Sequence, residues 1–154
     1  MVIIKGENKM TEKKIKVGYT CGVYDLFHVG HLNLFERCKK YCDYLIVGVC
    51  DDEYVRNVKH KEPMINQTDR TRIVNALKVV DEAHVIDTET TIDKMLALKK
   101  FNYNVLFAGD DWKGSERFIA TQKQFEENGA DVEVVFFPYT QGVSTSKLRD
   151  ELKK

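Results

Sequence analysis

The stretch that decides the fold runs from Ile15 to Cys50 and reads IKVGYTCGVYDLFHVGHLNLFERCKKYCDYLIVGVC. Residues 15–20 have the β-rich composition of a strand, and residues 30–41 place apolar side chains three and four positions apart, as one face of a helix does. Residues 44–50 are almost continuously apolar, which is typical of a strand covered on both faces. We therefore predict a strand, a helix and a second, buried strand of a parallel sheet.

The rest of the chain continues this alternation. Helices are predicted from about Asp51, from Thr68 or Asp69 to about Val80, over 92–100, over 116–128 and from about Ser146, and strands over 83–86, 104–108 and 132–137. The helix predicted to end near Val80 is expected after a basic, irregular stretch, and its inward residues are predicted to be Ile73, Ala76, Leu77 and Val80. The pattern predicts an α/β, Rossmann-like, doubly wound parallel sheet of about five strands with helices on both faces. Residues 15–154 are expected to form this single domain, after a flexible arm over residues 1–14.

Composition narrows the class of protein further. Hydrophobic residues make up 43% of the 154 residues and charged residues 31%, which fits a folded domain and excludes a disordered chain. The 24 basic and 24 acidic side chains cancel, so general nucleic-acid binding is not expected. We see no apolar run of the roughly 18 to 20 residues that a membrane helix needs, and no secretory signal near the start.

The cysteines indicate the redox environment. Cys21, Cys38, Cys42 and Cys50 contain no C-x-x-C pair and stand among apolar neighbours. They are predicted to be buried free thiols in a cytoplasmic protein. Cys38 and Cys42 could share a helix face, but two thiolates need two further ligands to hold zinc, so no metal site with protein ligands is expected.

Ligands of parallel sheets bind at the carboxyl ends of the strands. The predicted loops there are 21–31, 109–114 and 138–146. The first contains His28, Gly30 and His31 where a strand gives way to a helix. A helix N-terminus attracts anions, glycine permits a close approach, and imidazoles donate hydrogen bonds to phosphate oxygens. The loop favours a phosphate-bearing ligand, although His28 could simply pack and His31 simply begin the helix.

The last loop and a basic stretch extend this hypothesis. Hydroxyl groups stand directly before the final helix, on Thr140, Ser144, Thr145 and Ser146. They could cap that helix, bind a second phosphate, or do both. Lys59, Lys61 and Arg70 supply cations from mid-chain, although a run of charges is usually only a solvated face.

Four motifs resemble those of a known family. His28-Val29-Gly30-His31 resembles the nucleotide-binding H-x-G-H of the nucleotidylyltransferase superfamily, and Val143-Ser144-Thr145-Ser146 resembles its I-S-T-S/T motif. Val80-Asp81-Glu82 partly matches the R-Y-V-D-E segment of the cytidylyltransferase branch. The run GDDWKG at 109–114 is similar to the G-D-D-W-E-G of glycerol-3-phosphate cytidylyltransferases. The resemblance covers about residues 15–150.

This resemblance implies transfer of CMP from CTP to a phosphomonoester, with release of pyrophosphate and no covalent enzyme intermediate. The catalytic residues it implies are His28, His31, Lys61 and Arg70. The nucleotide-binding residues it implies are Gly22, Val23, Tyr24, Asp25, Gly30, Lys78, Gly109, Asp111, Thr140, Gly142, Ser144 and Thr145. The acceptor-binding residues it implies are Lys59, Lys94 and Trp112, of which Trp112 could equally belong to the core. Mg²⁺, carried on the CTP phosphates rather than by protein ligands, and a homodimer are implied as well.

Three residues depart from the family pattern and leave the acceptor open. Tyr139 stands where the family often has Arg, Gln141 where it has an acid, and Lys78 where it has Arg. The GDDW run favours sn-glycerol 3-phosphate. Phosphocholine, phosphoethanolamine, a pentitol phosphate, a phosphorylated amide, or adenylyl transfer from ATP are alternatives. A non-catalytic α/β sensor domain is a remote alternative, and the lack of G-x-G-x-x-G after the first strand disfavours a dehydrogenase.

Overall fold

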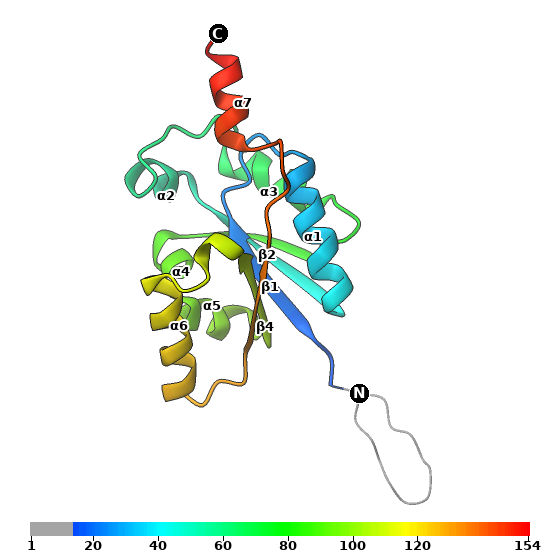
Figure 1. The fold of residues 1–154 in the computed structure, drawn as a ribbon, viewed down its shortest axis with the longest axis vertical. Helices are drawn as coiled ribbons and strands as arrows, with labels where there is room; N and C mark the ends of the chain where they lie inside the picture. The colour runs from blue at the N-terminus through cyan, green and yellow to red at the C-terminus, as the bar shows by residue number, and fades with distance from the viewer. Residues whose placement is uncertain (1–13) are drawn as a thin grey trace, which may run out of the picture.

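The computed structural model describes residues 14–154, so the arm expected at 1–14 lies outside the described residues except for Lys14. Five parallel strands form one sheet in the order β3-β2-β1-β4-β5 (Figure 1). The strands are β1 (Val17–Gly22), β2 (Tyr44–Cys50), β3 (Glu82–Ile86), β4 (Val105–Gly109) and β5 (Glu133–Phe137). The helices are α1 (Val29–Tyr41), α2 (Asp52–Asn57), α3 (Gln67–Asn75), α4 (Thr88–Ile92), α5 (Lys94–Phe101), η1 (Asp110–Trp112), α6 (Glu116–Glu127) and α7 (Thr145–Leu152). The predicted doubly wound Rossmann-like fold is confirmed.

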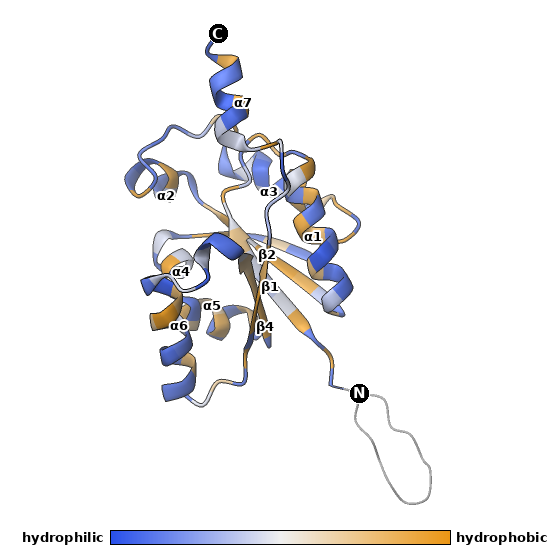
Figure 2. Ribbon diagram, in the orientation of Figure 1, coloured by the Kyte–Doolittle hydropathy of each residue, from blue (hydrophilic) through white to orange (hydrophobic). Residues whose placement is uncertain are grey.

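Helices cover both faces of the sheet, as the apolar strands require. On one face α1 and α3 contribute Phe35 and Val74 to a core that includes Phe107. On the other face α5 and α6 pack against Leu106, the neighbour of Phe107 on β4. Successive strand residues point to opposite faces, so one apolar strand serves both cores. Figure 2 shows the resulting pattern of hydropathy, with hydrophobic residues on the strands inside the molecule and largely hydrophilic residues on the outer faces of the helices.

The strand pairing opens a gap at one edge of the sheet. β1 pairs with β2 along its whole length, from Val17 opposite Tyr44 to Gly22 opposite Val49. Its pairing with β4 consists of Gly18 opposite Val105 and Tyr19 opposite Leu106. Beyond that point the Thr20 hydroxyl donates to the Phe107 carbonyl at 3.1 Å. The two central strands therefore separate toward their carboxyl ends, at the point where the strand order reverses.

Two helix predictions need correction. The helix expected to reach Val80 ends at Asn75, and its inward residue is Val74, whereas Ile73 is 39% exposed and Ala76 is exposed as well. Asn66 caps the start of this helix by accepting the Asp69 backbone N–H, and Leu77 and Val80 reach the core from the turns that follow.

The helix expected over 92–100 is found as α5 (Lys94–Phe101), and a separate short helix before it, α4 (Thr88–Ile92), was not predicted. Asp93 has a non-helical ψ of 100° and ends α4, and its carboxylate then accepts the backbone N–H groups of Met95 and Leu96 at the start of α5. Among residues 14–154, no helix has the length and apolar character needed to cross a membrane.

Candidate active site

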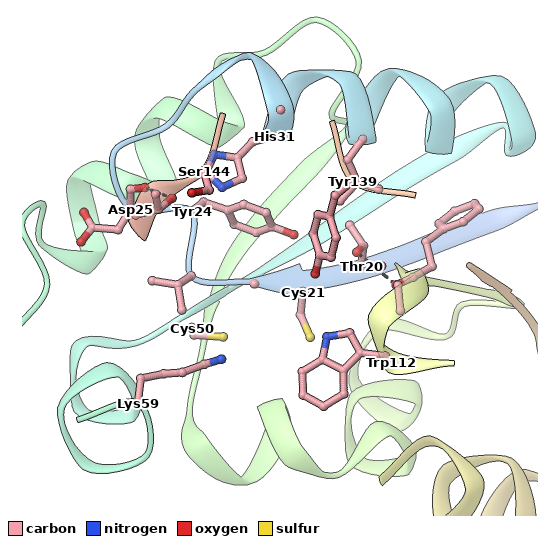
Figure 3. A pocket seen from close by; sticks show the side chains of 18 of the residues that line it. Thr20, Cys21, Tyr24, Asp25, His31, Cys50, Lys59, Trp112, Tyr139 and Ser144 are labelled. Carbon is pink, nitrogen blue, oxygen red and sulfur yellow. Dashed lines mark hydrogen bonds between the residues drawn. The ribbon is translucent and has the colours of Figure 1, made fainter. Parts of the chain in front are cut away.

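A cavity of about 450 Å³ lies at the carboxyl edge of the sheet, where β1 and β4 separate (Figure 3). Doubly wound sheets bind their ligands at this position. The three loops singled out from the sequence, 21–31, 109–114 and 138–146, all contribute lining residues. The prediction that these loops converge is therefore confirmed.

His28 and His31 form a stacked pair at the start of α1. The His28 Nδ1 accepts the Gly30 backbone N–H at 3.0 Å, and the His31 Nδ1 accepts the His28 backbone N–H at 3.2 Å. The two rings lie 3.9 Å apart between centroids, inclined by 26°. Because each Nδ1 is an acceptor, the neutral form of each ring carries its proton on Nε2. Both imidazoles thus keep one N–H donor for a ligand.

The surroundings keep this pair neutral. Burial, and secondly the neighbouring His28, lower the pKa of His31 to about 4, and burial lowers the pKa of His28 as well. A proton on Nδ1 would also end the hydrogen bond from the backbone, because a protonated nitrogen cannot accept. Tyr24 supports the pair from below, its ring edge-on to His31 with centroids 5.4 Å apart. At neutral pH the site therefore offers two uncharged, fixed donors.

The last loop lines the cavity beside the start of α1. Ser144 caps α7 by accepting the Lys147 backbone N–H at 3.0 Å, so the capping interpretation of this residue is confirmed. The Thr145 hydroxyl donates to the Asp25 carbonyl at 3.0 Å, and Asn33 donates to the Thr140 hydroxyl at 3.1 Å. These bonds fix the loop against the first motif. The hydroxyl-bearing residues still line the cavity, so capping and phosphate binding remain compatible.

A Cβ on Gly30 would lie 2.8 Å from the His28 ring and 3.3 Å from Val143. The first approach is closer than a Cβ atom normally comes and the second is tight, so a larger residue here would have to displace the His28 ring. The Gly30 and His31 backbone N–H groups of this first turn are already bonded to His28, so a ligand at this helix start would meet the imidazole Nε2–H groups and the positive end of the helix dipole.

Lys59 and Lys61 line the cavity from an exposed segment that follows α2. Asp25 anchors the end of that segment, since its buried carboxylate accepts the Met64 and Ile65 backbone N–H groups at 2.8 and 2.9 Å. It also pairs with Arg149 of α7, with side-chain exposures of 1% for Asp25 and 17% for Arg149. Asp25 therefore ties together the first motif, the lysine-bearing segment and α7.

Comparisons with known proteins identify the family of this chain. A model of cytidylyltransferase-like proteins matches residues 19–151. The chain belongs to this cytidylyltransferase-like family. Glycerol-3-phosphate cytidylyltransferase of Bacillus subtilis (strain 168) is 35% identical over 133 residues, covering 86% of this chain and 94% of that protein. FAD synthase of Thermococcus onnurineus is 38% identical over 132 residues, covering 85% and 84%.

A solved structure gives the same result for the fold. The lipopolysaccharide core biosynthesis protein of Thermoplasma volcanium superposes with a TM-score of 0.71 at 26% identity, covering 83% of this chain and 100% of that one. The named relatives are nucleotidyltransferases, so this cytidylyltransferase-like protein is an enzyme of that type. The sensor-domain alternative has no support among them.

Within this cytidylyltransferase-like site, Arg70 does not lie where it was expected. Its side chain is fully buried and does not line the cavity. The guanidinium donates to the carbonyl groups of Val23, Cys50 and Ile65 at 2.6 to 2.8 Å and pairs with Asp52 at 2.6 Å. These bonds hold three chain segments together and occupy the guanidinium outside the cavity lining. The structure therefore does not bring Arg70 to the cavity with the other expected cations.

Three of the expected nucleotide-binding residues lie outside the cavity lining: Lys78, Asp111 and Gly142. Lys78 is exposed in the turns after α3. Asp111 is exposed and faces the Tyr139 hydroxyl, and burial together with this carboxylate raises the pKa of Tyr139 to about 12. Gly142 has a φ of +85° and shapes the last loop.

The remaining expected residues meet at the cavity. These are His28, His31, Lys61, Gly22, Val23, Tyr24, Asp25, Gly30, Gly109, Thr140, Ser144, Thr145, Lys59, Lys94 and Trp112. Their individual roles toward a ligand remain predictions. Among residues 14–154 no group of three or more His, Cys, Asp or Glu side chains could hold a metal ion.

Sequence reasoning missed several lining residues with polar groups, among them Arg117, Arg149 and Tyr54. Arg117 comes from the first turn of α6, and Arg149 from the second turn of α7. Neither residue lies in a loop at the carboxyl end of a strand, where ligands of parallel sheets are expected, so this expectation did not point to either of them. A weaker signal existed for Arg117, because it follows the GDDWKG run by only three positions.

Proposed function

We propose that the protein transfers CMP from CTP to the phosphate of sn-glycerol 3-phosphate, giving CDP-glycerol and pyrophosphate. The relatives named glycerol-3-phosphate cytidylyltransferase, at 32 to 35% identity over 86% of the chain, support this acceptor. The GDDW run at 109–112 supports it as well. The transferred group, the acceptor and the product are parts of the proposal rather than of the family assignment.

The stacked imidazoles carry the proposal. In the reaction an acceptor phosphate oxygen attacks the α-phosphorus of CTP in line, the bond from that phosphorus to the bridging oxygen breaks, and pyrophosphate leaves. Two fixed Nε2–H donors would stabilise the charge that develops on the α-phosphate, at no reorganisation cost at the moment of reaction. Lys59 and Lys61 would draw the anionic reactants together. An already ionised acceptor phosphate needs no general base.

Mg²⁺ enters this scheme with the nucleotide. The donors of the cavity are imidazole, ammonium, guanidinium, hydroxyl and backbone N–H groups, which suit phosphate oxygens rather than a hard cation. Asp25, the one acid among the described lining residues, is already bound to Arg149 and to backbone N–H groups. These residues do not fit a protein-held Mg²⁺, so no step is assigned to one. The ion is proposed to travel on the phosphates.

A second candidate is AMP transfer from ATP. The FAD synthases at 38 and 34% identity support it, and FAD is FMN, itself a phosphomonoester, joined to AMP. The two candidates share the histidine pair and differ in the base and in the acceptor. They are therefore separated by substrate and not by mechanism.

A two-way screen tests the proposal. CTP and ATP are each combined with glycerol 3-phosphate, phosphocholine, phosphoethanolamine, a pentitol phosphate and FMN, and pyrophosphate release is measured. The expected result is release with CTP and glycerol 3-phosphate, and a product that contains equal amounts of cytidine and glycerol. Release with ATP and FMN alone would replace the first candidate by the second. No release with any pair would overturn both.

We also propose a homodimer, supported by the resemblance to the family. Sedimentation equilibrium is expected to give twice the chain mass of 17.9 kDa. A mass of one chain at micromolar concentration would contradict this.

A further inference from the structure

We infer that Arg117 binds the acceptor's phosphate together with Lys94, and that this cation pair selects anionic acceptors. The inference rests on the proposed transfer to a phosphomonoester and adds to it a residue that belongs to none of the sequence motifs. It concerns the wall of the cavity built by α4, α5 and α6.

Two cations from different helices meet at one carbonyl group. The Arg117 Nη2 donates to the Thr91 carbonyl oxygen at 3.0 Å. Lys94, at the start of α5, donates its Nζ to the same oxygen and also contacts the Cys21 sulfur at 3.3 Å. Both side chains line the cavity. Sharing one acceptor brings the guanidinium and the ammonium group within a few ångströms of each other.

No carboxylate neutralises this pair. Within residues 14–154 neither Arg117 nor Lys94 forms a salt bridge. Lys94 is only 5% exposed, so water provides little screening. A buried charge without a counter-ion is costly, and two like charges at one carbonyl repel each other. An anion of charge two would offset both effects, which is the charge of a phosphomonoester at neutral pH.

Arg117 also keeps a donor for such an anion. Its Nε is buried and has no hydrogen-bond partner. Buried N–H donors are nearly always paired in folded proteins, so an unpaired one at a cavity wall points to a ligand. The guanidinium lies over the Trp112 ring, 5.1 Å from its centroid, which holds it in place. A fixed, planar guanidinium binds phosphate oxygens through two parallel N–H groups.

The position of the cation pair suits an acceptor rather than the nucleotide. α5 and α6 cover the face of the sheet opposite to α1, so the pair and the histidines stand on different sides of the cavity. Figure 3 shows His31 above the strands and Trp112, the neighbour of Arg117, below them. An acceptor phosphate held at Arg117 and Lys94 would thus face an α-phosphate held at the histidines, as in-line transfer requires.

Substitution of Arg117 tests the inference. Arg117→Gln removes the charge with similar length, and Arg117→Lys keeps the charge but loses the planar fork. The matched control is Lys113→Gln, because Lys113 is exposed nearby and does not line the cavity. We expect Arg117→Gln to raise the KM for the acceptor about 10- to 100-fold and to leave the KM for CTP within about twofold, since hydrogen bonds to charged groups are lost. Arg117→Lys should recover part of the affinity, and the control should match the wild type.

A binding experiment without turnover provides the second readout. Trp112 is the sole tryptophan of the chain, so its fluorescence reports on this wall. Titration with inorganic phosphate or glycerol 3-phosphate, without CTP, should give a saturable change in the wild type and a much weaker affinity in Arg117→Gln. If Arg117→Gln does not fold, as urea unfolding would reveal, Arg117→Lys decides both measurements.

The outcomes separate this inference from the proposed function. A wild type that releases no pyrophosphate with any acceptor overturns the proposed function, while the phosphate titration still tests the anion site. An active wild type whose Arg117 variants keep the acceptor KM and the phosphate affinity overturns the role of Arg117 alone. A rise confined to the KM for CTP would move Arg117 to the nucleotide and equally overturn the inference.

Discussion

The substitution His28→Asn separates two roles that one side chain combines. In the structure the His28 Nδ1 accepts the Gly30 backbone N–H and so begins α1, while its Nε2 remains free at the cavity. Asparagine is among the best residues at the N-cap position that His28 occupies, because its side-chain oxygen can accept a backbone N–H group of the first turn. It has no atom that reaches the place of Nε2. The variant should therefore keep the helix cap and lose the donor.

The two effects differ enough in size to be measured separately. Loss of one donor to a developing oxyanion costs about 3 to 4 kcal/mol, so kcat of His28→Asn should fall by two to three decades, that is about 100- to 1,000-fold. The free energy of unfolding should stay within about 0.5 kcal/mol of the wild type. His28→Ala loses both functions and should add a loss of about 1 kcal/mol in stability. Against a total stability of about 5 to 15 kcal/mol this leaves nearly every molecule folded, so unfolding cannot imitate the kinetic loss.

Pyrophosphate release gives kcat and urea unfolding gives the stability of the three proteins. If His28→Asn keeps kcat within about threefold of the wild type, His28 acts as a helix cap alone. The proposal that His28 donates to the α-phosphate would then be wrong. If His28→Asn is as unstable as His28→Ala, the cap is not what the side chain contributes.

Three further predictions follow from the buried groups. The pKa of His31 is lowered to about 4, against 6.5 in the unfolded chain, so the unfolded chain binds the proton more readily. The free energy of unfolding should therefore fall as pH drops from about 6.5 to about 4, by at most about 3 kcal/mol. His31→Asn should flatten this pH dependence as measured by urea unfolding. Arg70→Met leaves the Asp52 carboxylate without its partner and should lower the free energy of unfolding by about 3 to 5 kcal/mol, as urea unfolding would show. The KM for either substrate should not change in the folded fraction. A higher KM for CTP at unchanged stability would instead show that Arg70 contacts the nucleotide. Asp25→Asn should cost a similar amount and speed proteolysis of segment 57–66, and equal cleavage rates would argue against the anchoring role.

Much of the fold could be predicted because periodicity records which faces are buried. The run 44–50 is apolar throughout, and β2 is indeed covered on both faces. The apolar periodicity failed to predict helix boundaries where a single polar side chain caps the helix. The Asp93 carboxylate starts a new helix, and α3 begins at the Asn66 cap and ends at Asn75, short of the predicted Val80. Such bonds between a side chain and nearby backbone compete with the apolar pattern and are invisible to it.

The site was predictable to the extent that it sits on loops. The expectation that ligands bind at the carboxyl ends of parallel strands selected the three loops that line the cavity, because parallel strands bring these ends to one edge of the sheet. It gave no help with Arg117 and Arg149, which project from helices. Nor could it show that Arg70 is buried, since the three carbonyl groups it binds come from segments up to 47 positions away.

What makes a cation functional here is the absence of a partner rather than the residue type. Arg70 and Arg149 are each paired with a buried or largely buried carboxylate, from Asp52 and Asp25, and both hold the framework together. Arg117 and its neighbours in the cavity wall have no such carboxylate among the described residues. Lys94 is buried and Arg117 is half-buried, and an unpaired cation in such a place lowers stability, so we infer that a ligand supplies the missing charge. Neutral substitutes of the framework arginines are thus expected to lower stability, by about 3 to 5 kcal/mol for Arg70→Met, whereas Arg117→Gln should leave the folded enzyme intact and raise the KM for the anionic acceptor.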